Sequence, residues 1–336
     1  MPYSLIEVYQ KRSSVLKNSF DNSEGSSEKE TNGSAMQAVI RRRVKAGLGN
    51  VALLLVALTF ASCSSTPSQN VTAVESECPP RSAQSTLSVL HLRSPDMSGG
   101  ERDVWVYRPV TPDTQTLPVL YVLHGLPGEP AEIFAKSVCA YMDARIAAGA
   151  PPFVVAAPDG NGAVHSDSEW ADSEDGEDRL ESFVTEAVIP AVEGMHPRDR
   201  DHRAIAGFSM GGYGATNLAL RHPDLFGQLI SVAGYYHVSD PDGIFGGDST
   251  LIEANSPDQN LGHARNLRIM LLDCEGEDLP LVQGEAARFH ELLKRAGVPS
   301  TLAYAPGYHD LSYAESQWPT EVTFLEAGWK DASGFS

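Results

Sequence analysis

Residues 205–215, with the sequence IAGFSMGGYGA, place four glycines close to a single serine, Ser209. The pattern Gly-x-Ser-x-Gly is typical of a strained turn in which a buried strand ends, the chain reverses at the serine, and a helix begins. Gly207 and Gly211 stand where larger side chains would collide with the neighbouring strand and helix. A motif this short also arises by chance in glycine-rich loops with a solvated serine. The neighbouring sequence is therefore needed to distinguish a strained turn from such a loop.

The residues around this motif form an alternating series of strand and helix patterns. Short apolar runs rich in Val, Ile and Leu, most of them closed by glycine, are typical of buried parallel strands, and helical patterns lie between them. This alternation predicts an α/β fold, a mostly parallel central sheet with helices on both faces, in a single domain. The expected strands cover residues 85–92, 102–109, 118–125, 153–160, 203–209, 227–234, 268–276 and 300–307, the first two as an antiparallel pair, and the expected helices cover residues 131–146, 178–193, 213–223, 283–296 and 319–329.

The first part of the chain has the pattern of an export signal. Residues 1–35 are polar and precede a complete signal, so we interpret them as a mis-assigned or disordered extension ahead of a start at Met36. Residues 36–62 join a basic segment to the apolar run VALLLVALTFA, which is shorter than the roughly 20 residues of a membrane span and suits a signal peptide. The following FASC resembles a bacterial lipobox, which predicts a lipid anchor at Cys63, with ordinary secretion as the alternative.

Residues 63–84 are rich in Ser, Thr and Pro, and we interpret them as a flexible tether to a catalytic domain at residues 85–336.

The net charge of −19 argues against nucleic acid and anionic lipid headgroups as partners. Membrane attachment is therefore expected only through the lipid anchor. We interpret the acidic residues 167–181 as a solvated loop and helix start rather than as a rim of the ligand pocket. The oligomeric state stays open.

Three cysteines follow the lipobox: Cys78, Cys139 and Cys274. An exported chain permits one disulfide among them, although Cys139 on an expected helix and Cys274 at an expected strand end are interpreted as buried free thiols. No cysteine has a partner at metal-ligand spacing, so neither a metal nor an organic cofactor is expected.

A serine hydroxyl needs a base to become a nucleophile, and His309 is the best candidate among ten histidines. It follows the last expected strand in APGYHD, and ligands of such sheets bind at the carboxyl ends of the strands. A third group, a carboxylate, holds the imidazole in its useful tautomer. The segment LLDCEGEDL offers Asp278, in the loop after the strand, and we expect this residue to be the acid, with Asp273 and Glu277 as alternatives.

Acyl-transfer chemistry also requires two backbone N–H groups that stabilise the oxyanion of the transition state. One is expected from Met210, which directly follows the serine and begins a helix. The other is expected from Leu126 in LHGLPGEP, where Gly125 and Gly128 let the loop bend. We interpret His124 as a structural brace of this loop.

At this point the sequence resembles the "putative esterase" family of α/β-hydrolases, which includes esterase D (S-formylglutathione hydrolase), feruloyl and acetylxylan esterases, enterochelin esterases and mycobacterial mycolyltransferases. The motifs that carry the resemblance are LHGLPG, APDGNG, SEWADS, FVTEAVIP, GFSMGGYGA, RHPDLFG and APGYHD, which cover nearly the whole expected domain. The resemblance implies an α/β-hydrolase fold with Ser209 as nucleophile, Asp278 as acid, His309 as base, and Leu126 and Met210 as oxyanion donors.

Two departures from the family pattern concern the site. Glu275 stands between Cys274 and Gly276, whereas the family often has the glycine directly after the cysteine. After His309 the family often has Asp-Trp, but this chain has DLSY, so the aromatic is missing or is replaced by Tyr313.

These features predict an exported serine hydrolase that cleaves carboxylic esters of small molecules or glycans through an acyl-enzyme intermediate. The first alternative is an acyltransferase that moves an acyl group to a sugar hydroxyl, as mycolyltransferases do. The second alternative is a non-catalytic surface binding protein on a hydrolase scaffold.

Overall fold

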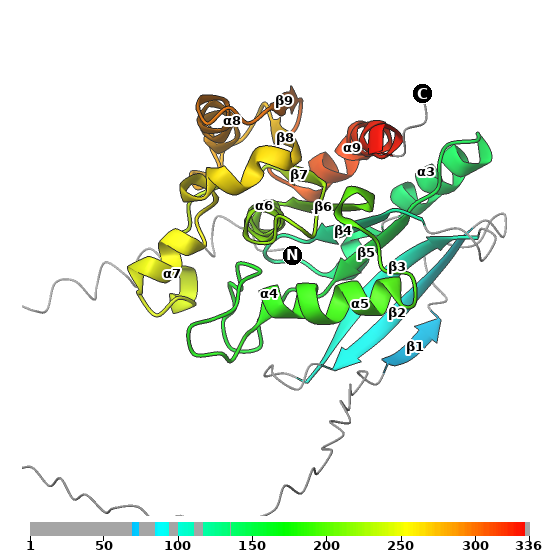
Figure 1. Ribbon diagram of the computed structural model, residues 1–336, viewed down its shortest axis with the longest axis horizontal. Helices are drawn as coiled ribbons and strands as arrows, with labels where there is room; N and C mark the ends of the chain where they lie inside the picture. Colours follow the sequence, from blue (N-terminus) through cyan, green and yellow to red (C-terminus); the bar gives the residue numbers. More distant parts are fainter. Residues whose placement is uncertain (1–68, 74–84, 94–99, 111–116, 135, 333–336) are drawn as a thin grey trace, which may run out of the picture. The chain divides into compact units, whose positions relative to one another are not determined.

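A nine-stranded sheet runs through the folded unit (Figure 1). The strands at its amino-terminal edge pair antiparallel, and the other strands pair parallel. The computed structural model describes residues 69–73, 85–93, 100–110, 117–134 and 136–332. The strand order is β1-β2-β3-β5-β4-β6-β7-β8-β9. The strands are β1 (Gln69–Ala73), β2 (Ser85–Arg93), β3 (Glu101–Pro109), β4 (Val119–Leu123), β5 (Val154–Pro158), β6 (Arg203–Phe208), β7 (Gln228–Val232), β8 (Arg268–Cys274) and β9 (Ser300–Ala305).

Strand directions follow the sequence prediction. β2 pairs antiparallel with β3, as expected, and β3 pairs antiparallel with β5. From β5 through β4 to β9 every neighbouring pair is parallel. The predicted α/β fold with a mostly parallel sheet is therefore confirmed. The carboxyl ends of β4, β6, β7, β8 and β9 consequently meet at one edge of the sheet.

Helices cover both faces of the sheet because side chains of each strand alternate between two apolar clusters. In β4, for example, Tyr121 belongs to one cluster and Val122 to the other. The first face packs against α4 (Leu180–Ser182), the π-helical turn Phe183–Val188 that continues it, α5 (Ile189–Glu193), α6 (Met210–Arg221) and α8 (Glu285–Arg295). The second face packs against α3 (Lys136–Ala147) and α9 (Leu311–Ala332), and the shorter helices α2 (Pro130–Ile133) and α7 (Ser249–Ala254) lie in connections.

The closing helix begins earlier than expected. The sequence places its start at Pro319, but α9 begins at Leu311 and carries Pro319 in its interior. The Asp310 carboxylate accepts a hydrogen bond from the backbone N–H of Tyr313 (2.9 Å), so Asp310 caps the helix directly after His309. This cap places the first turns of α9 beside the end of the sheet that carries the predicted site.

Two other expectations about the chain need correction. The expected tether contains a strand, since β1 pairs with β2 from Gln69 to Ala73. Cys139 is disulfide-bonded instead of a free thiol, whereas Cys274 is a free buried thiol, as expected. The expected extension, signal peptide and lipobox cysteine lie outside the described residues. Within the described part of the chain, no helix combines the length and the hydrophobicity needed to cross a membrane.

A buried ion pair anchors the strand that leads to Ser209. Arg203, the first residue of β6, donates two hydrogen bonds to the Glu193 carboxylate at the end of α5 (2.6 and 2.9 Å). The Tyr121 hydroxyl of β4 donates a third (3.0 Å). Because these partners are buried, their hydrogen bonds fix β6 against β4 and α5.

Candidate active site

Ser209 stands between β6 and α6 in a backbone conformation that non-glycine residues rarely adopt, with φ 57° and ψ −119°. Its N–H donates to the carbonyl of Val232 in β7 (2.9 Å), and its carbonyl accepts from the N–H of Tyr213 (3.0 Å). The turn is therefore held from both the sheet and the helix. The predicted strand–turn–helix around the serine is present.

The flanking glycines are required because backbone approaches backbone at this turn. A Cβ atom on Gly207 would lie 2.2 Å from the carbonyl oxygen of Gly211. A Cβ atom on Gly211 would lie 2.0 Å from the carbonyl oxygen of Leu123, at the end of β4. Side chains at either position would push α6 away from the sheet.

Two hydrogen bonds connect Ser209 to a carboxylate through one imidazole ring. His309 Nε2 lies 2.9 Å from Ser209 Oγ, and His309 Nδ1 lies 2.8 Å from Glu277 Oε2. An ionised carboxylate only accepts hydrogen bonds, so Nδ1 carries the proton and Nε2 is free to accept from the hydroxyl. The Phe208 ring packs against the imidazole with 4.8 Å between ring centroids, which helps to fix its orientation. This is the geometry of a nucleophile, a general base and an orienting acid.

The acid in this arrangement is Glu277, and the sequence prediction of Asp278 is wrong in this respect. The loop after β8 continues the pairing with the chain after β9, since the N–H of Glu275 donates to Ala305 and the N–H of Gly276 donates to Gly307 (2.9 and 3.0 Å). Glu277 then turns its side chain inward, where it is 5% exposed, whereas Asp278 is exposed to solvent. The sequence named Glu277 only as an alternative, because consecutive acids in a loop carry no sign of which one faces inward.

The other alternative, Asp273, lies buried in β8 and accepts from the backbone N–H of Cys274 (2.9 Å). Burial raises the pKa of Asp273 to about 6, and the nearby charge of Glu277 adds to this effect. Burial alone would also raise the pKa of Glu277, but hydrogen bonds from His309 and from the N–H of Leu279 (2.9 Å) lower it below the usual value. Glu277 is therefore the stronger acid of the pair and the one whose carboxylate is hydrogen-bonded to His309.

Asp273, Cys274 and Glu277 carry potential metal ligands within 4.8 Å of one another. Hydrogen bonds already account for these atoms, because the Cys274 thiol donates to Glu277 Oε2 (3.4 Å) and the same oxygen accepts from His309. Burial, followed by the charge of Glu277, raises the pKa of Cys274 to about 12, so it stays a protonated thiol, which is a poor metal ligand.

The predicted oxyanion donors, Met210 and Leu126, flank Ser209. Met210 is the first residue of α6, and N–H groups in a first helical turn have no acceptor inside the helix. The Leu126 loop packs against Ser209, since a Cβ on Gly125 would lie 3.3 Å from the Cβ of Ser209. Their role in binding an oxyanion stays a prediction.

His124 braces this loop, in agreement with its expected structural role. Its Nδ1 donates to the carbonyl of Gly125 (2.8 Å), and its Nε2 accepts from the N–H of Gly160 (2.9 Å). The indole N–H of Trp170 donates to the carbonyl of His124 (3.1 Å). Since both ring nitrogens are engaged, His124 is a neutral ring that holds the Leu126 loop in place.

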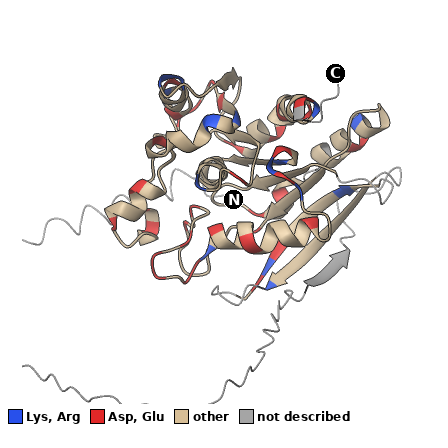
Figure 2. Ribbon diagram, viewed as in Figure 1, with Lys and Arg blue, Asp and Glu red and all other residues tan. Residues whose placement is uncertain are grey.

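The acidic residues 167–181 lie in the loop before α4 and at the start of that helix, where Figure 2 shows several Asp and Glu positions in red. They are not a solvated loop along their whole length. Only the tip at residues 174–177 is exposed. Trp170 is fully buried and packs against Gly214 of α6, where an added Cβ would lie 2.6 Å from the indole side chain. Asp178, also fully buried, accepts hydrogen bonds from three consecutive N–H groups of residues 163–165 (2.6 to 2.9 Å). Trp170 therefore packs against α6, and Asp178 holds the loop that carries Trp170. The acidic composition of this segment did not indicate these buried contacts.

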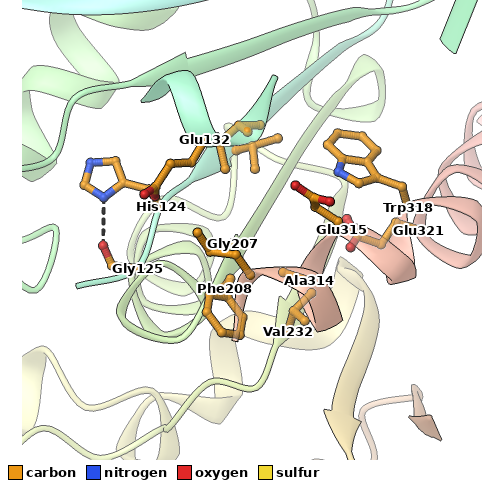
Figure 3. A pocket seen from close by; sticks show the side chains of 13 residues that line it. His124, Gly125, Glu132, Gly207, Phe208, Val232, Ala314, Glu315, Trp318 and Glu321 are labelled. Atoms are coloured by element: carbon orange, nitrogen blue, oxygen red, sulfur yellow. Dashed lines mark hydrogen bonds between the residues drawn. The ribbon is translucent and has the colours of Figure 1, made fainter. Parts of the chain in front are cut away.

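A small pocket, partly open to solvent, lies beside this constellation (Figure 3). Ser209 and His309 do not line it, but their direct neighbours Gly125 and Phe208 do. Its aromatic wall is Trp318 of α9, and not Tyr313, which is buried against Gly307. The sequence did not indicate this pocket, because its residues come from β4, α2, β6, β7 and α9. It is lined by Val122, His124, Gly125, Glu132, Ile133, Gly207, Phe208, Val232, Leu311, Ala314, Glu315, Trp318 and Glu321.

Comparison with known proteins relates the chain to esterases. The model of the family described as "Putative esterase" matches residues 94–324. An esterase of Mycobacterium tuberculosis is 26% identical over 229 residues, which cover 58% of this chain and 49% of the relative. The S-formylglutathione hydrolase of Rattus norvegicus is 29% identical over 153 residues, 40% of this chain and 51% of that protein. The chain thus spans about half the length of these two curated relatives, 49% and 51%.

Solved structures support the same relationship. A ferulic acid esterase is 25% identical with a TM-score of 0.64, over 73% of this chain and 99% of that one. An S-formylglutathione hydrolase from Agrobacterium tumefaciens is 18% identical with a TM-score of 0.62, over 78% of this chain and 98% of that one, and this likeness shows the fold alone. The expected α/β-hydrolase fold is confirmed.

We expect Glu277→Gln to slow covalent labelling of Ser209 by a fluorophosphonate by roughly 10³- to 10⁴-fold, because an amide no longer holds the proton on Nδ1 of His309. Asp278→Asn, the matched control, should change the rate by less than about twofold, as exposed substitutions usually do. The measurement is the rate of mass increase of the intact protein. A larger loss for Asp278→Asn would show that Glu277 is not the acid.

Gly211→Ala should lower the free energy of unfolding by about 1–3 kcal/mol or prevent folding, because the methyl group has no space beside the carbonyl of Leu123. Gly262→Ala is the control, since a Cβ there would meet nothing within 4 Å. Its effect should stay within about 0.5 kcal/mol. Urea denaturation of both variants measures the difference, and equal effects would contradict the packing argument.

Proposed function

Because the chain belongs to the "Putative esterase" family of α/β-hydrolases, we propose that it hydrolyses carboxylic esters through an acyl-enzyme on Ser209. The observation that carries this proposal is the continuous line of hydrogen bonds from Ser209 through His309 to Glu277, with donor–acceptor distances of 2.9 and 2.8 Å. A binding protein on the same scaffold has no need of a nucleophile, base and acid in this alignment.

The chemistry follows from the proton positions. Ser209 Oγ attacks the ester carbonyl while its proton passes to Nε2 of His309, and the ionised Glu277 stabilises the imidazolium that forms. The negative charge that develops on the carbonyl oxygen is stabilised by the N–H groups of Leu126 and Met210. His309 then donates the proton to the leaving alkoxide. A water molecule, deprotonated by His309, attacks the acyl-enzyme and releases the acid.

The substrate that we propose is an ester of a small molecule or a glycan, for which the relatives named after feruloyl esters and S-formylglutathione are precedents. Acyl transfer to a sugar hydroxyl is the alternative, since an alcohol could resolve the same intermediate in place of water. A long acyl chain would require an apolar groove beside Ser209. The pocket next to Ser209 instead contains Glu132, Glu315 and Glu321, which favours short or polar esters.

The first measurement is hydrolysis of aryl esters with acyl chains of two to sixteen carbons. We expect turnover to be fastest for short chains and to fall by at least about 10⁴-fold in Ser209→Ala, because the nucleophile is lost. The Gly262→Ala variant controls for effects of substitution as such. Wild-type turnover in Ser209→Ala would rule out the mechanism, and faster turnover with added sugar alcohols would favour acyl transfer.

We further propose that the protein is exported and anchored in the cell envelope through a lipid on Cys63. The supporting pattern is the basic and apolar segment of residues 36–62 followed by FASC. Cys63→Ser should move the protein from the membrane fraction to the soluble fraction, and Ser64→Ala is the matched control. Unchanged membrane association of Cys63→Ser would exclude this anchor.

A further inference from the structure

The pocket beside the nucleophile combines acidic side chains with an aromatic wall. Figure 3 shows Glu315 and Glu321 next to Trp318, on the side of the pocket away from His124 and Gly125. Glu132 of α2 lines the pocket as well. Since Gly125 and Phe208 belong to the same lining and adjoin Ser209, a group bound here would be part of a molecule that reaches the nucleophile.

Glu321 is the feature that points to a ligand. Its side chain lines the pocket although the residue is only 5% exposed, and its carboxyl forms no hydrogen bond or ion pair with any described residue. Burial alone raises the pKa of Glu321 to about 8. A buried carboxyl without a partner lowers stability, and nothing in the packing of α9 requires a carboxyl at this position.

The charges around Glu321 indicate that the ligand is positively charged. Three glutamates line the pocket, and none of its described lining residues is Lys or Arg. His124 is neutral because its Nε2 accepts the N–H of Gly160. A whole-chain net charge of −19 adds an attraction for cations and a repulsion for anions. The face of the Trp318 indole is a further favourable surface for a cation, above all for an alkylated one.

We propose that this pocket is a subsite for a positively charged ammonium group of the ester substrate, held by Glu321, Glu315 and the indole of Trp318 while Ser209 attacks the carbonyl. The proposal rests on the proposed ester hydrolysis and narrows its substrates to amino or quaternary ammonium esters. The ammonium belongs either to the acyl part or to the alcohol part of the ester, and the experiment below separates the two.

Binding of a cation here is coupled to pH. The other titratable groups of the pocket lining are Glu132 of α2, His124 of the loop after β4 and Glu315 of α9, while β6 and β7 contribute only Gly207, Phe208 and Val232. Burial raises the pKa of Tyr313 on α9, and the charge of Glu321 adds to this effect. Because the raised pKa keeps Glu321 protonated near neutral pH, ionisation above about pH 8 strengthens the attraction for an ammonium group. The preference for cationic esters should therefore increase between pH 6 and pH 9.

The raised pKa of Glu321 also indicates that the neutral replacement Glu321→Gln is compatible with folding. The folded protein holds the Glu321 proton up to about pH 8, whereas the unfolded chain releases it near its ordinary value. The unfolded state therefore binds fewer protons in this interval, and stability falls as pH rises through it. Glu321→Gln removes this loss, so the melting temperature of the variant should match or exceed that of the wild type at pH 8.5.

The experiment compares esters in pairs that have the same shape and differ in charge, with the purified full chain. For the alcohol side the pair is acetylcholine and 3,3-dimethylbutyl acetate. For the acyl side it is the 4-nitrophenyl esters of 4-(trimethylammonio)butyrate and 5,5-dimethylhexanoate. The ratio of kcat/KM within each pair is measured for the wild type, Glu321→Gln and Glu315→Gln. Glu291→Gln, which removes one exposed charge on α8, controls for net charge.

At pH 9, where Glu321 is ionised, we expect one pair to favour the charged ester by at least about tenfold in the wild type, and Glu321→Gln to reduce that ratio about tenfold. Glu315→Gln should reduce it less, because Glu315 is exposed at the mouth of the pocket. Glu291→Gln should leave it unchanged. A preference for the neutral ester in both pairs, or an unchanged ratio in Glu321→Gln, would overturn the proposal.

A binding measurement, which needs no turnover, distinguishes failure of the ammonium subsite from failure of the proposed ester hydrolysis. Tetramethylammonium is titrated at pH 9 into Ser209→Ala and into Ser209→Ala/Glu321→Gln, and calorimetry reports the affinity. Binding that is weakened at least about tenfold by Glu321→Gln supports the subsite even where no ester is cleaved. Equal affinity in both variants, or no binding to Ser209→Ala, overturns it.

Discussion

The close approach of α6 to the ends of β4 and β6 positions every group of the site. Gly211 leaves no space for a Cβ beside the carbonyl of Leu123, and Ser209 is forced into its uncommon backbone conformation. Because α6 lies so close to these strands, the Ser209 hydroxyl points away from the sheet edge toward His309, and the N–H of Met210 lies at the start of the helix. Buried contacts on the far side maintain this approach, above all Trp170 against Gly214 and Arg203 with Glu193.

The acidic side chains near Ser209 show how environment assigns different tasks to one chemical group. Glu277 receives hydrogen bonds from His309 and Leu279 and stays ionised, which suits it to stabilise an imidazolium. Asp273 and Glu321 are buried with fewer donors, and burial raises their pKa values to about 6 and about 8. Burial also raises the pKa of Glu169 well above its usual range, and its carboxyl bonds to the Tyr235 hydroxyl. The number and geometry of donors, and not residue type, distinguish these groups.

Much of the fold could be predicted because its signals are local. The parallel strands are short apolar runs, the antiparallel pair at the start alternates, and the elbow glycines are spaced as a strand–turn–helix requires. Ser209 and His309 were indicated for the same reason, since each follows an expected strand. The early start of α9 was not indicated, because Pro319 is a stronger local signal than the Asp310 cap that the structure uses.

The sheet, the turn at Ser209 and the type of chemistry that its neighbours can support follow from local patterns in the sequence, since they depend on periodicity and on residues close in the chain. The choice of Glu277 over Asp278 depends on the fold, because the pairing of residues 275 and 276 with the chain after β9 sets which side chain faces His309. The fold alone also created the pocket of Glu132, Glu315, Trp318 and Glu321. Its walls are nearly 200 residues apart in the chain and meet through packing across the sheet edge, a long-range contact that no local pattern encodes.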